Sequence, residues 1–298
     1  MKHRAGFVAI LGRPNAGKST LLNALMGTKL AIVAPRPQTT RTAIQGVLRL
    51  PGAQIVFVDT PGIHESSTLL NKRMMDQVRA SADADVVLFL VDATARFSDD
   101  DAGAVDLVKK TGAPAIAVFN KIDKLREKAK LLALIERYRE MHDFAAYVPI
   151  SALKGDGVEV LRKETLARLP EGPALYPKDH LTDQPERFLA AEIIREKVLH
   201  LTRQEVPHAV AVMIENWEDT PGLVRIAATI YIERPGQKAI LIGAGGALLK
   251  KIGTLARREI ETLVGKKVFL QTFVKVRPNW RQDPEFLAAT DWRGMAGT

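Results

Sequence analysis

The stretch FVAILGRPNAGKST, residues 7–20, decides the fold of this chain. Its first five residues form an unbroken apolar run, which is typical of a strand buried on both faces. A glycine-rich turn follows, and residues 20–26 have the apolar spacing of a helix. In this strand–loop–helix setting, residues 12–19 match the phosphate-binding motif G-x-x-x-x-G-K-[ST]. The sequence therefore predicts a nucleotide phosphate site at the start of the chain.

Each residue type in this loop suits phosphate binding. Glycines let the backbone approach closely, so that its N–H groups and the positive end of the following helix face the β-phosphate. We expect the Lys18 ammonium to bridge the β- and γ-phosphates and the Ser19 hydroxyl to coordinate Mg²⁺. The nucleotide-binding residues predicted here are Gly12, Asn15, Ala16, Gly17, Lys18, Ser19 and Thr20.

Two later motifs select the base. The tetrapeptide Asn120-Lys121-Ile122-Asp123 follows the apolar run 115–119. A carboxylate at Asp123 accepts hydrogen bonds from both N1–H and the N2 amine of guanine, a paired donor edge that adenine lacks. Buried polar groups left unpaired penalise the wrong base, so Asp123 predicts GTP. Ser151, Ala152 and Leu153 follow the run 145–150 and would direct a backbone N–H toward guanine O6.

Two further segments are expected at the γ-phosphate. Asp59 ends the run 54–58 and suits a water-mediated contact with Mg²⁺, while the N–H of Gly62 suits the γ-phosphate. In the irregular segment 31–43, we choose Thr40 over Thr39 as the hydroxyl that completes the magnesium shell. The predicted Mg²⁺ residues are therefore Ser19, Thr40 and Asp59, and segments of this kind act as switches released on hydrolysis.

The apolar runs also predict the architecture of the first domain, residues 1–173. Runs at 54–58, 86–91, 115–119 and 145–150 alternate with helical or irregular segments. This alternation predicts an α/β fold with a mostly parallel, doubly wound sheet. Residues 46–50 are expected to form an antiparallel edge strand.

The second half of the chain has a different pattern. Residues 174–185 are proline-rich and are predicted to be a linker. A helix at 186–203 and a hairpin of strands 210–214 and 224–232 follow, and residues 238–242 lead as a strand into a glycine-rich loop. A helix to about 263 and a strand at 267–276 complete an α+β domain at 186–281, with a C-terminal tail at 282–298.

Charge and composition favour a polyanionic partner. The formal net charge is +9, and residues 234–281 hold eleven basic residues against only two acidic ones. The chain has no cysteine, which excludes disulfides and thiolate metal sites. No apolar run approaches the roughly 20 residues of a membrane helix, and the N-terminus does not resemble a signal peptide. These features indicate a cytoplasmic protein without a transmembrane segment.

The basic stretch contains an RNA-binding signature. Residues 242–252, IGAGGALLKKI, fit the I-G-x-x-G-x-x-I-x-x-I pattern of a type II KH domain, which clamps single-stranded backbone on the glycine loop. Because Ala244 and Gly245 stand between the outer glycines, phosphate contact there would depend on backbone N–H groups. The predicted RNA-binding residues are Ile242, Gly243, Ala244, Gly245, Gly246, Lys250, Lys251, Arg257 and Arg258.

Five ordered motifs, GRPNAGKST, PQTTR, DTPGIH, NKID and SALKG, resemble translation-factor-class GTPases. Together with the KH signature, the chain resembles the Era family of bacterial ribosome-assembly GTPases over nearly its whole length. The resemblance implies hydrolysis of GTP to GDP and binding of the 3′ end of 16S rRNA in the 30S subunit. It also implies a peripheral contact with the membrane, and we expect a monomer.

The resemblance further implies an unusual route to hydrolysis. Many GTPases have a water-orienting glutamine after the glycine of the DxxG motif, but this chain has Ile63, which has no polar group. The family implies assistance by a monovalent cation, with Asn15 as a ligand for K⁺. The implied catalytic set is Lys18, Thr40, Gly62 and Asn15.

Two alternatives to a GTP-controlled rRNA-binding switch remain open from the sequence. In one, the KH domain anchors the protein to RNA and the first domain binds nucleotide with slow or vestigial hydrolysis. In the other, the protein is a GTPase of tRNA modification or of large-subunit assembly, classes that share the phosphate loop and the TTR and DTPG motifs.

Overall fold

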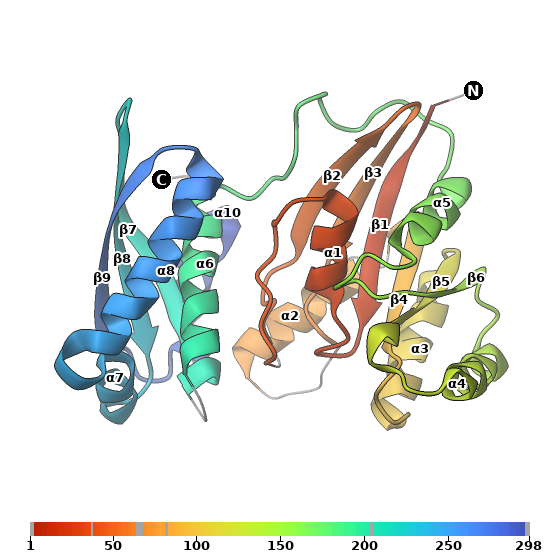
Figure 1. Cartoon of the computed structure of the whole chain (residues 1–298), viewed down its shortest axis with the longest axis horizontal. Coiled ribbons are helices and arrows are strands. Elements are labelled where there is room, and N and C mark those ends of the chain that lie inside the picture. The colour runs from red at the N-terminus through yellow and green to blue at the C-terminus, as the bar shows by residue number, and fades with distance from the viewer. Residues whose placement is uncertain (1–2, 37, 64–67, 81–82, 203–205, 296–298) are drawn as a thin grey trace. The chain divides into compact units, whose positions relative to one another are not determined.

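A computed structural model of the chain describes residues 3–36, 38–63, 68–80, 83–202 and 206–295 (Figure 1). Three residues of predicted segments lie outside these ranges: Pro37 of the PQTTR motif, His64 of the DTPGIH motif and Arg203 at the end of the helix expected at 186–203. The chain forms two compact units: one of Met1–Ala31, Thr40–Ser66 and Asn71–Asp183, and one of Ile32–Thr39, Ser67–Leu70 and Gln184–Thr298. The exact domain boundaries expected from the sequence stay a proposal.

The first unit is built on a six-stranded sheet in the order β2-β3-β1-β4-β5-β6. The strands are β1 (Arg4–Gly12), β2 (Ile44–Leu50), β3 (Ala53–Asp59), β4 (Val86–Asp92), β5 (Ala115–Asn120) and β6 (Ala146–Pro149). All neighbours pair in parallel except β2 and β3, which are antiparallel. The predicted α/β fold with a mostly parallel sheet and an antiparallel edge strand is therefore confirmed.

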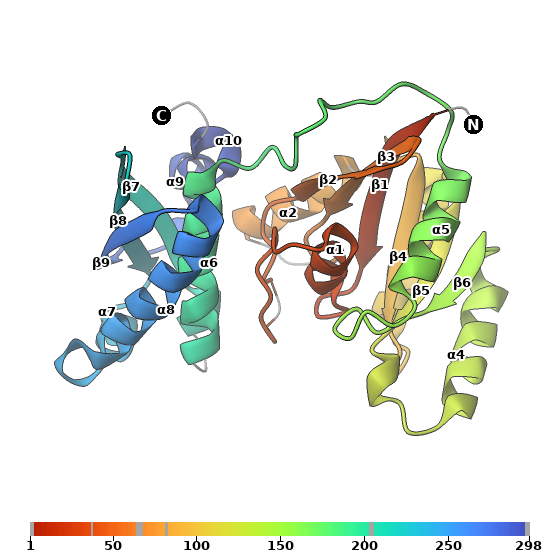
Figure 2. The ribbon, with the colours of Figure 1, turned by 45° about the horizontal axis from the view of Figure 1, so that its top comes forward.

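Helices cover both faces of this sheet (Figure 2). They are α1 (Lys18–Met26), α2 (Leu69–Ala80), α3 (Asp99–Thr111), α4 (Lys128–Met141) and α5 (Val158–Arg168). One face packs against apolar residues of α1 and α5 and the other against α2, α3 and α4. Because both faces are buried, the strands are continuously apolar, which is the pattern read in the sequence.

The predicted linker is attached to the edge of this sheet by hydrogen bonds. The side-chain oxygen of Gln54 accepts from the backbone N–H of Leu175 at 2.7 Å and of Tyr176 at 2.9 Å. Leu181 accepts from the N–H of Val47 at 2.8 Å. A proline-rich segment that lies along β2 and β3 is thus held in one path rather than left as a free tether.

The second unit contains a three-stranded sheet in the order β7-β8-β9. Its strands are β7 (Ala211–Asp219), β8 (Leu223–Ile232) and β9 (Lys267–Val276), with β7 and β8 antiparallel and β8 and β9 parallel. The predicted hairpin and final strand are confirmed. Helices α6 (Glu186–Leu201) and α8 (Ala247–Val264) cover one face of the sheet in Figures 1 and 2 and share its apolar core.

The interpretation of residues 238–242 as a strand is wrong. They lie in helix α7 (Pro235–Ile242), so the glycine loop joins two helices. Pro235 begins this helix and Gln237 accepts from the backbone N–H of Arg234 at 3.0 Å, an N-terminal cap that the short apolar run did not reveal. Among described residues, no single helix is long and apolar enough to cross a membrane; only α7 and the following segment 244–264, bent by 48°, reach the required length and hydropathy together.

The end of the chain adds two short helices to the second unit, α9 (Pro284–Ala289) and α10 (Trp292–Met295). The ring of Phe286 on α9 meets Tyr231 on β8 edge-on, with centroids 4.9 Å apart. Trp280 is buried and donates from Nε1 to the backbone oxygen of Ala209 at 2.9 Å. The segment expected as a tail therefore packs onto the sheet.

Residues 32–39, which precede Thr40, belong to the second unit. Ile32 is buried in its core, and the N–H of Val33 donates to a carboxylate oxygen of Glu196 on α6 at 2.8 Å. His200 on the same helix lies 2.7 Å from the Val33 oxygen. No periodicity in the sequence pointed to this placement.

Candidate nucleotide site and RNA-binding loop

The phosphate loop joins β1 to α1 with the backbone conformation that its motif requires. Gly17 caps α1 at φ 101°, in the left-handed region, and Asn15 has φ 63°. A Cβ on Gly17 would lie 2.4 Å from the side-chain nitrogen of Asn120. Glycine at this position therefore lets Asn120 approach the phosphate loop directly.

Lys18 is buried at the start of α1. Its Nζ donates to the backbone oxygens of Gly12 and Arg13, both at 3.0 Å. Burial lowers the pKa of Lys18 to about 8, and the nearby Asp59 carboxylate opposes this shift. The ammonium therefore lies in a desolvated position where its attraction for an anion is strong.

The three residues predicted for Mg²⁺ converge from three separate elements. Ser19 donates to Asp59 Oδ2 at 2.6 Å, and its hydroxyl lies 2.7 Å from that of Thr40, which also donates to Asp59 at 3.3 Å. The hydroxyl of Thr39 instead donates to the backbone oxygen of Arg36 at 2.7 Å. Thr39 and Thr40 thus have different partners, and Thr40 is the threonine beside Ser19 and Asp59.

Asp59 is fully buried, and its Oδ1 atom has no hydrogen-bond partner among the described residues. Burial raises the pKa of Asp59 to about 6, while Lys18 and the two hydroxyls partly offset the rise. A buried carboxylate oxygen without a donor is costly unless a ligand satisfies it. Two hydroxyls and a carboxylate form a hard oxygen set that fits Mg²⁺.

The residues predicted to contact the base form a second cluster. Asn120 donates to the backbone oxygen of Ala16 at 2.8 Å and accepts from the N–H of Ala152 at 3.0 Å, so it joins the phosphate loop to the 151–154 loop. Ser151 donates to Asp123 at 2.7 Å, which orients the carboxylate. Leu153 is 75% exposed and Ala152 is buried, so the hydroxyl of Ser151 is the side-chain group by which this loop meets Asp123.

The side chain of Lys121 is hydrogen-bonded to the phosphate loop. Its Nζ donates to the backbone oxygen of Asn15 and to the carboxylate of Asp92, each at 2.6 Å. Lys121 has φ 68°, a left-handed conformation that turns the chain after β5. The two predicted motifs therefore act as one connected frame.

The segment after β3 also lies against the phosphate loop. A Cβ on Gly62 would be 2.8 Å from Cα of Pro14, and the N–H of Ile63 donates to the Gly12 oxygen at 3.3 Å. The Ile63 side chain packs against the core shared by α2, α3 and α4. An apolar side chain in that position cannot orient a water molecule.

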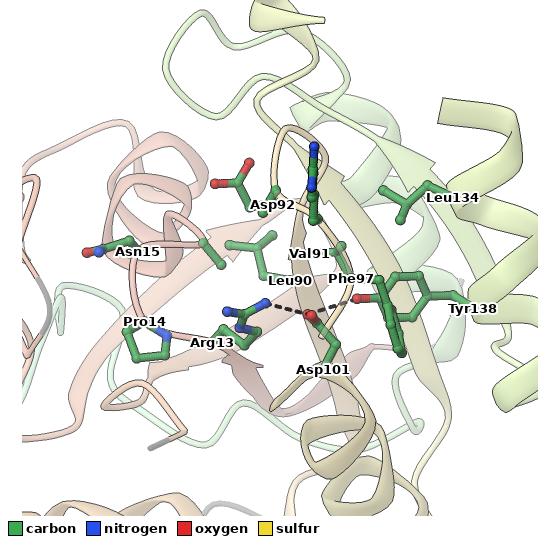
Figure 3. A pocket seen from close by; sticks show the side chains of 13 residues that line it. Arg13, Pro14, Asn15, Leu90, Val91, Asp92, Phe97, Asp101, Leu134 and Tyr138 are labelled. Atoms are coloured by element: carbon green, nitrogen blue, oxygen red, sulfur yellow. Dashed lines mark hydrogen bonds and ion pairs between the residues drawn. The ribbon is translucent and has the colours of Figure 1, made fainter. Parts of the chain in front are cut away.

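A hydrogen-bond network joins the phosphate loop to α3 and α4, and the sequence did not predict it (Figure 3). Arg13 donates to Asp101 of α3 at 2.6 Å, and Tyr138 of α4 donates to the other oxygen of that carboxylate at 3.0 Å. These side chains line a cavity of about 220 Å³. The only signal in the sequence was the Ser98-x-x-Asp101 spacing of a helix cap, which does not predict a partner on the phosphate loop.

The predicted RNA-binding residues lie at the end of α7, in the loop between α7 and α8 and along α8 as far as Arg258. Ala244, Gly245, Lys250, Lys251 and Arg258 are exposed. Arg257 pairs with Glu261 at 2.8 Å, so part of its charge is compensated within α8. The glycine loop thus presents its backbone at the start of a basic helix.

Two family models match this chain. The model described as a 50S ribosome-binding GTPase matches residues 7–121, and the KH domain model matches residues 205–281. The GTPase Era of Geobacter metallireducens is 50% identical over 287 residues, which cover 95% of this chain and 96% of that protein. The chain belongs to the Era family of GTPases. Era of Ruminiclostridium cellulolyticum is 44% identical and covers 98% of this chain and 99% of its own length.

Solved Era structures share the fold of both units. A crystal structure of Era in complex with MgGDPNP and nucleotides 1506–1542 of 16S ribosomal RNA has a TM-score of 0.94 at 43% identity, and the match covers 97% of this chain and 99% of that one. A variant of Aquifex aeolicus Era bound to GDP and AlF₄⁻ gives the same values. The family and fold predicted from the motifs are therefore confirmed.

Proposed function

We propose that this member of the Era family binds and hydrolyses GTP in its first unit and binds the 3′ end of 16S rRNA through its KH domain. In this role it assists assembly of the small ribosomal subunit. The observation that carries the proposal is that the hydroxyls of Ser19 and Thr40 meet at Oδ2 of the buried Asp59. The other oxygen of this carboxylate, Oδ1, has no donor among the described residues, and the buried ammonium of Lys18 is nearby.

The nucleotide would lie along the phosphate loop with its base at the second cluster. Lys18 would exchange its two backbone partners for phosphate oxygens, and the N–H groups of residues 15–20 would donate to them. Ser19, Thr40 and Asp59 would hold Mg²⁺, which neutralises charge on the β- and γ-phosphates when it is bound. Asp123, oriented by Ser151, would accept from guanine.

Hydrolysis needs an oriented attacking water and a positive charge at the bridge between the phosphates. Because the apolar Ile63 side chain cannot orient the water, the N–H of Gly62 and the backbone near Thr40 would position the γ-phosphate and the water. We include K⁺ at Asn15 in the proposal, because the Asn15 side chain is exposed on the phosphate loop and is drawn pointing away from Asp101 in Figure 3. A cation there would take the electrostatic role of an arginine finger.

Other features of the proposal follow from charge and composition. The basic stretch 234–281 supports rRNA as the partner and would also allow a peripheral contact with an anionic membrane. A monomer in the cytoplasm, the domain boundaries and the individual site residues belong to the same proposal.

The decisive experiment measures GTP turnover and RNA binding by the same purified chain. We expect turnover above the uncatalysed rate, loss of nucleotide binding in Lys18→Ala, and parental behaviour in Lys109→Ala, whose ammonium is surface-exposed and pairs with Asp106. Turnover no faster than in Lys18→Ala would support the RNA-anchoring alternative instead.

Crosslinking and sequencing of the bound RNA, with and without a nonhydrolysable GTP analogue, identifies the RNA partner. Reads concentrated at the 3′ end of 16S rRNA are expected. Reads in tRNA or in large-subunit rRNA would contradict the proposal and favour the other GTPase classes.

A further inference from the structure

One face of β9 carries a regular row of exposed side chains. Lys267, Phe269, Gln271, Phe273 and Lys275 are all exposed and alternate with residues that turn toward the helices. We call these five residues the β9 row. Thr272, between them, lies beside Gly253 of α8, so the row faces away from the helix that follows the glycine loop.

The two phenylalanines are unusually exposed for their size. Phe269 is 47% and Phe273 50% accessible, whereas Phe286 is 4% accessible. With a rise of about 3.3 Å per residue, four residues place the two rings about 13 Å apart along the strand. Exposed aromatic side chains gathered on one face of a sheet mark a contact surface.

The charges around the row are not uniform. Lysines stand at both of its ends, and Arg225, opposite Phe269 on β8, places its guanidinium 5.9 Å from the centre of that ring. Two acidic side chains lie on β7, the strand at the opposite edge of the sheet. Glu218 is opposite Arg225, and Glu215 accepts a hydrogen bond from the Tyr231 hydroxyl at 2.9 Å. The positive part of this face is therefore the edge strand with the phenylalanines.

Helix α9 covers part of the same face of the sheet. Phe286 packs edge-on against Tyr231, which is opposite Lys275, and Arg277 lies over the Phe286 ring at 4.6 Å. The C-terminal helix α9 thus covers the β8 side at one end of the sheet. The β9 row remains outside this covered part, along the edge of the sheet.

We propose that the β9 row is a second binding surface for single-stranded RNA, separate from the glycine loop. Bases would stack on Phe269 and Phe273, the Gln271 amide between them would reach base edges, and Lys267 and Lys275 would contact phosphates at both ends. Phenylalanine has no polar group that distinguishes one base from another, so this surface binds RNA with little preference for its nucleotide sequence. The inference rests on the proposed RNA-binding function and extends it to the reverse face of the sheet.

A second copy of the chain fits the row less well. Two identical faces related by a two-fold axis would pair antiparallel and bring Lys267 close to Lys275 of the other copy at both ends. Like charges directly opposite are destabilising, whereas a phosphate backbone neutralises them. The charge pattern therefore favours a polyanion.

The test compares two RNA lengths with the full-length chain. A KH loop clamps four nucleotides, so a six-nucleotide RNA from the 16S 3′ end fills the glycine loop alone, while a 20-nucleotide unstructured RNA also reaches the β9 row. Fluorescence anisotropy gives the affinity for each. Phe269→Ala with Phe273→Ala is expected to weaken the long RNA about tenfold or more and to leave the short RNA and GTP turnover unchanged.

Matched variants separate stacking from other causes. Phe269→Leu with Phe273→Leu keeps apolar area without an aromatic face and is expected to behave like the alanine pair. Leu132→Ala, which truncates a side chain 65% exposed on α4, should bind both RNAs as the parental chain does. Lys267→Ala with Lys275→Ala should reduce the salt dependence for the long RNA only, by about 0.7 in slope per lost phosphate contact.

Photocrosslinking of 5-iodouridine RNA, read by mass spectrometry, is expected to mark Phe269 or Phe273. Parental affinity of the alanine pair for the long RNA, or crosslinks on α7 and α8 alone, would overturn the inference. Full binding of the long RNA by the leucine pair would also overturn it, because it shows that no aromatic face is needed. A dimer that the alanine pair dissociates would overturn it as well, since the row would then be a protein contact. Absence of binding to the six-nucleotide RNA contradicts the glycine-loop function, and the long RNA still tests the row.

Discussion

Arg13 of the phosphate loop donates from Nη1 to the carboxylate of Asp101 at 2.6 Å, so a residue of the nucleotide motif is fixed by a helix 88 positions later. The same carboxylate accepts from Tyr138 and from the N–H of Ser98, and burial together with this contact raises the pKa of Tyr138. Asp101 thereby ties α3, α4 and the phosphate loop together.

Asp101→Asn should destabilise the protein by roughly 2–3 kcal/mol, because it weakens charge-assisted hydrogen bonds in a part-buried site. It should also raise the KM for GTP, since Arg13 no longer holds the loop. Urea unfolding and steady-state turnover measure the two effects. Asp106→Asn on the exposed side of the same helix is the control, expected within about 0.5 kcal/mol of the parental chain. Equal midpoints for the two variants would remove Asp101 from this role.

Asp123→Asn should weaken GTP binding and favour xanthosine triphosphate. The carboxylate that accepts twice from guanine is replaced by an amide that donates to the xanthine oxygen, a reversal worth a few kcal/mol. Competition titration with both nucleotides measures the change. Unaltered GTP affinity would show that the Ser151–Asp123 pair is not the base site.

Turnover should rise when K⁺ replaces Na⁺ at constant ionic strength, and Asn15→Ala should remove most of that difference. Ile63→Ala should affect the chemical step little, because the Ile63 side chain packs against the core and has no polar group. Single-turnover rates in the two salts decide the matter. Identical rates would point to a positive charge supplied by the ribosome instead.

Binding of Mg²⁺ and GTP should weaken as the pH falls below about 6. The pKa of Asp59 is raised to about 6 by burial, and a metal ligand must lose its proton before it coordinates. Each pH unit below that value should cost up to about tenfold in affinity. Binding titrations with Mg²⁺ and GTP between pH 5 and 7.5 measure this change in affinity. The Asp59→Asn variant is the control, because its pH dependence reports only the titration of the nucleotide itself. Parallel curves of affinity against pH for the two proteins would contradict the prediction.

Ala244→Asp with Gly245→Asp should abolish binding of a short single-stranded rRNA while GTP turnover without RNA persists. Both positions are exposed, and a Cβ on Gly245 meets no atom within 4 Å. Gly245 has φ 57°, a left-handed conformation that aspartate tolerates better than most residues, so the two new charges face the RNA backbone at a small conformational cost. Substitution of Gly243 is less suitable, because its Cβ would lie 2.9 Å from Leu248. Filter binding at physiological salt gives the result, and retained affinity would reduce the loop to a helix cap.

Lys250→Ala with Lys251→Ala should instead weaken all RNAs alike. These ammonium groups lie on the exposed side of α8 and attract phosphates without reading bases. The slope of log affinity against log salt should fall by roughly one unit at most per lost contact. A variant that changes preference between sequences, with an unchanged slope, would contradict this assignment.

The sequence predicts most of the candidate nucleotide site because the determinants of that site are local in sequence. A buried parallel strand must be apolar and must end at the edge where the next loop begins, so the motifs after β1, β3, β5 and β6 were expected to meet. The choice of Thr40 over Thr39 stays a prediction, because both lie in an irregular segment where no periodicity separates them. The strand expected at residues 238–242 was wrong, because the four apolar residues after Lys238 fit a strand and a helix equally well.

The sequence by itself determined the order of most elements and the GTPase and KH signatures, since periodicity and glycine placement are properties of short segments. Only the tertiary structure decided that Arg13 pairs with Asp101, that residues 32–39 pack in the core of the second unit, and that Phe269 and Phe273 stand on a basic edge. These facts depend on contacts between distant segments and on which face of a strand the helices cover. Neither is encoded in a local pattern, because the same alternation permits either face to be buried.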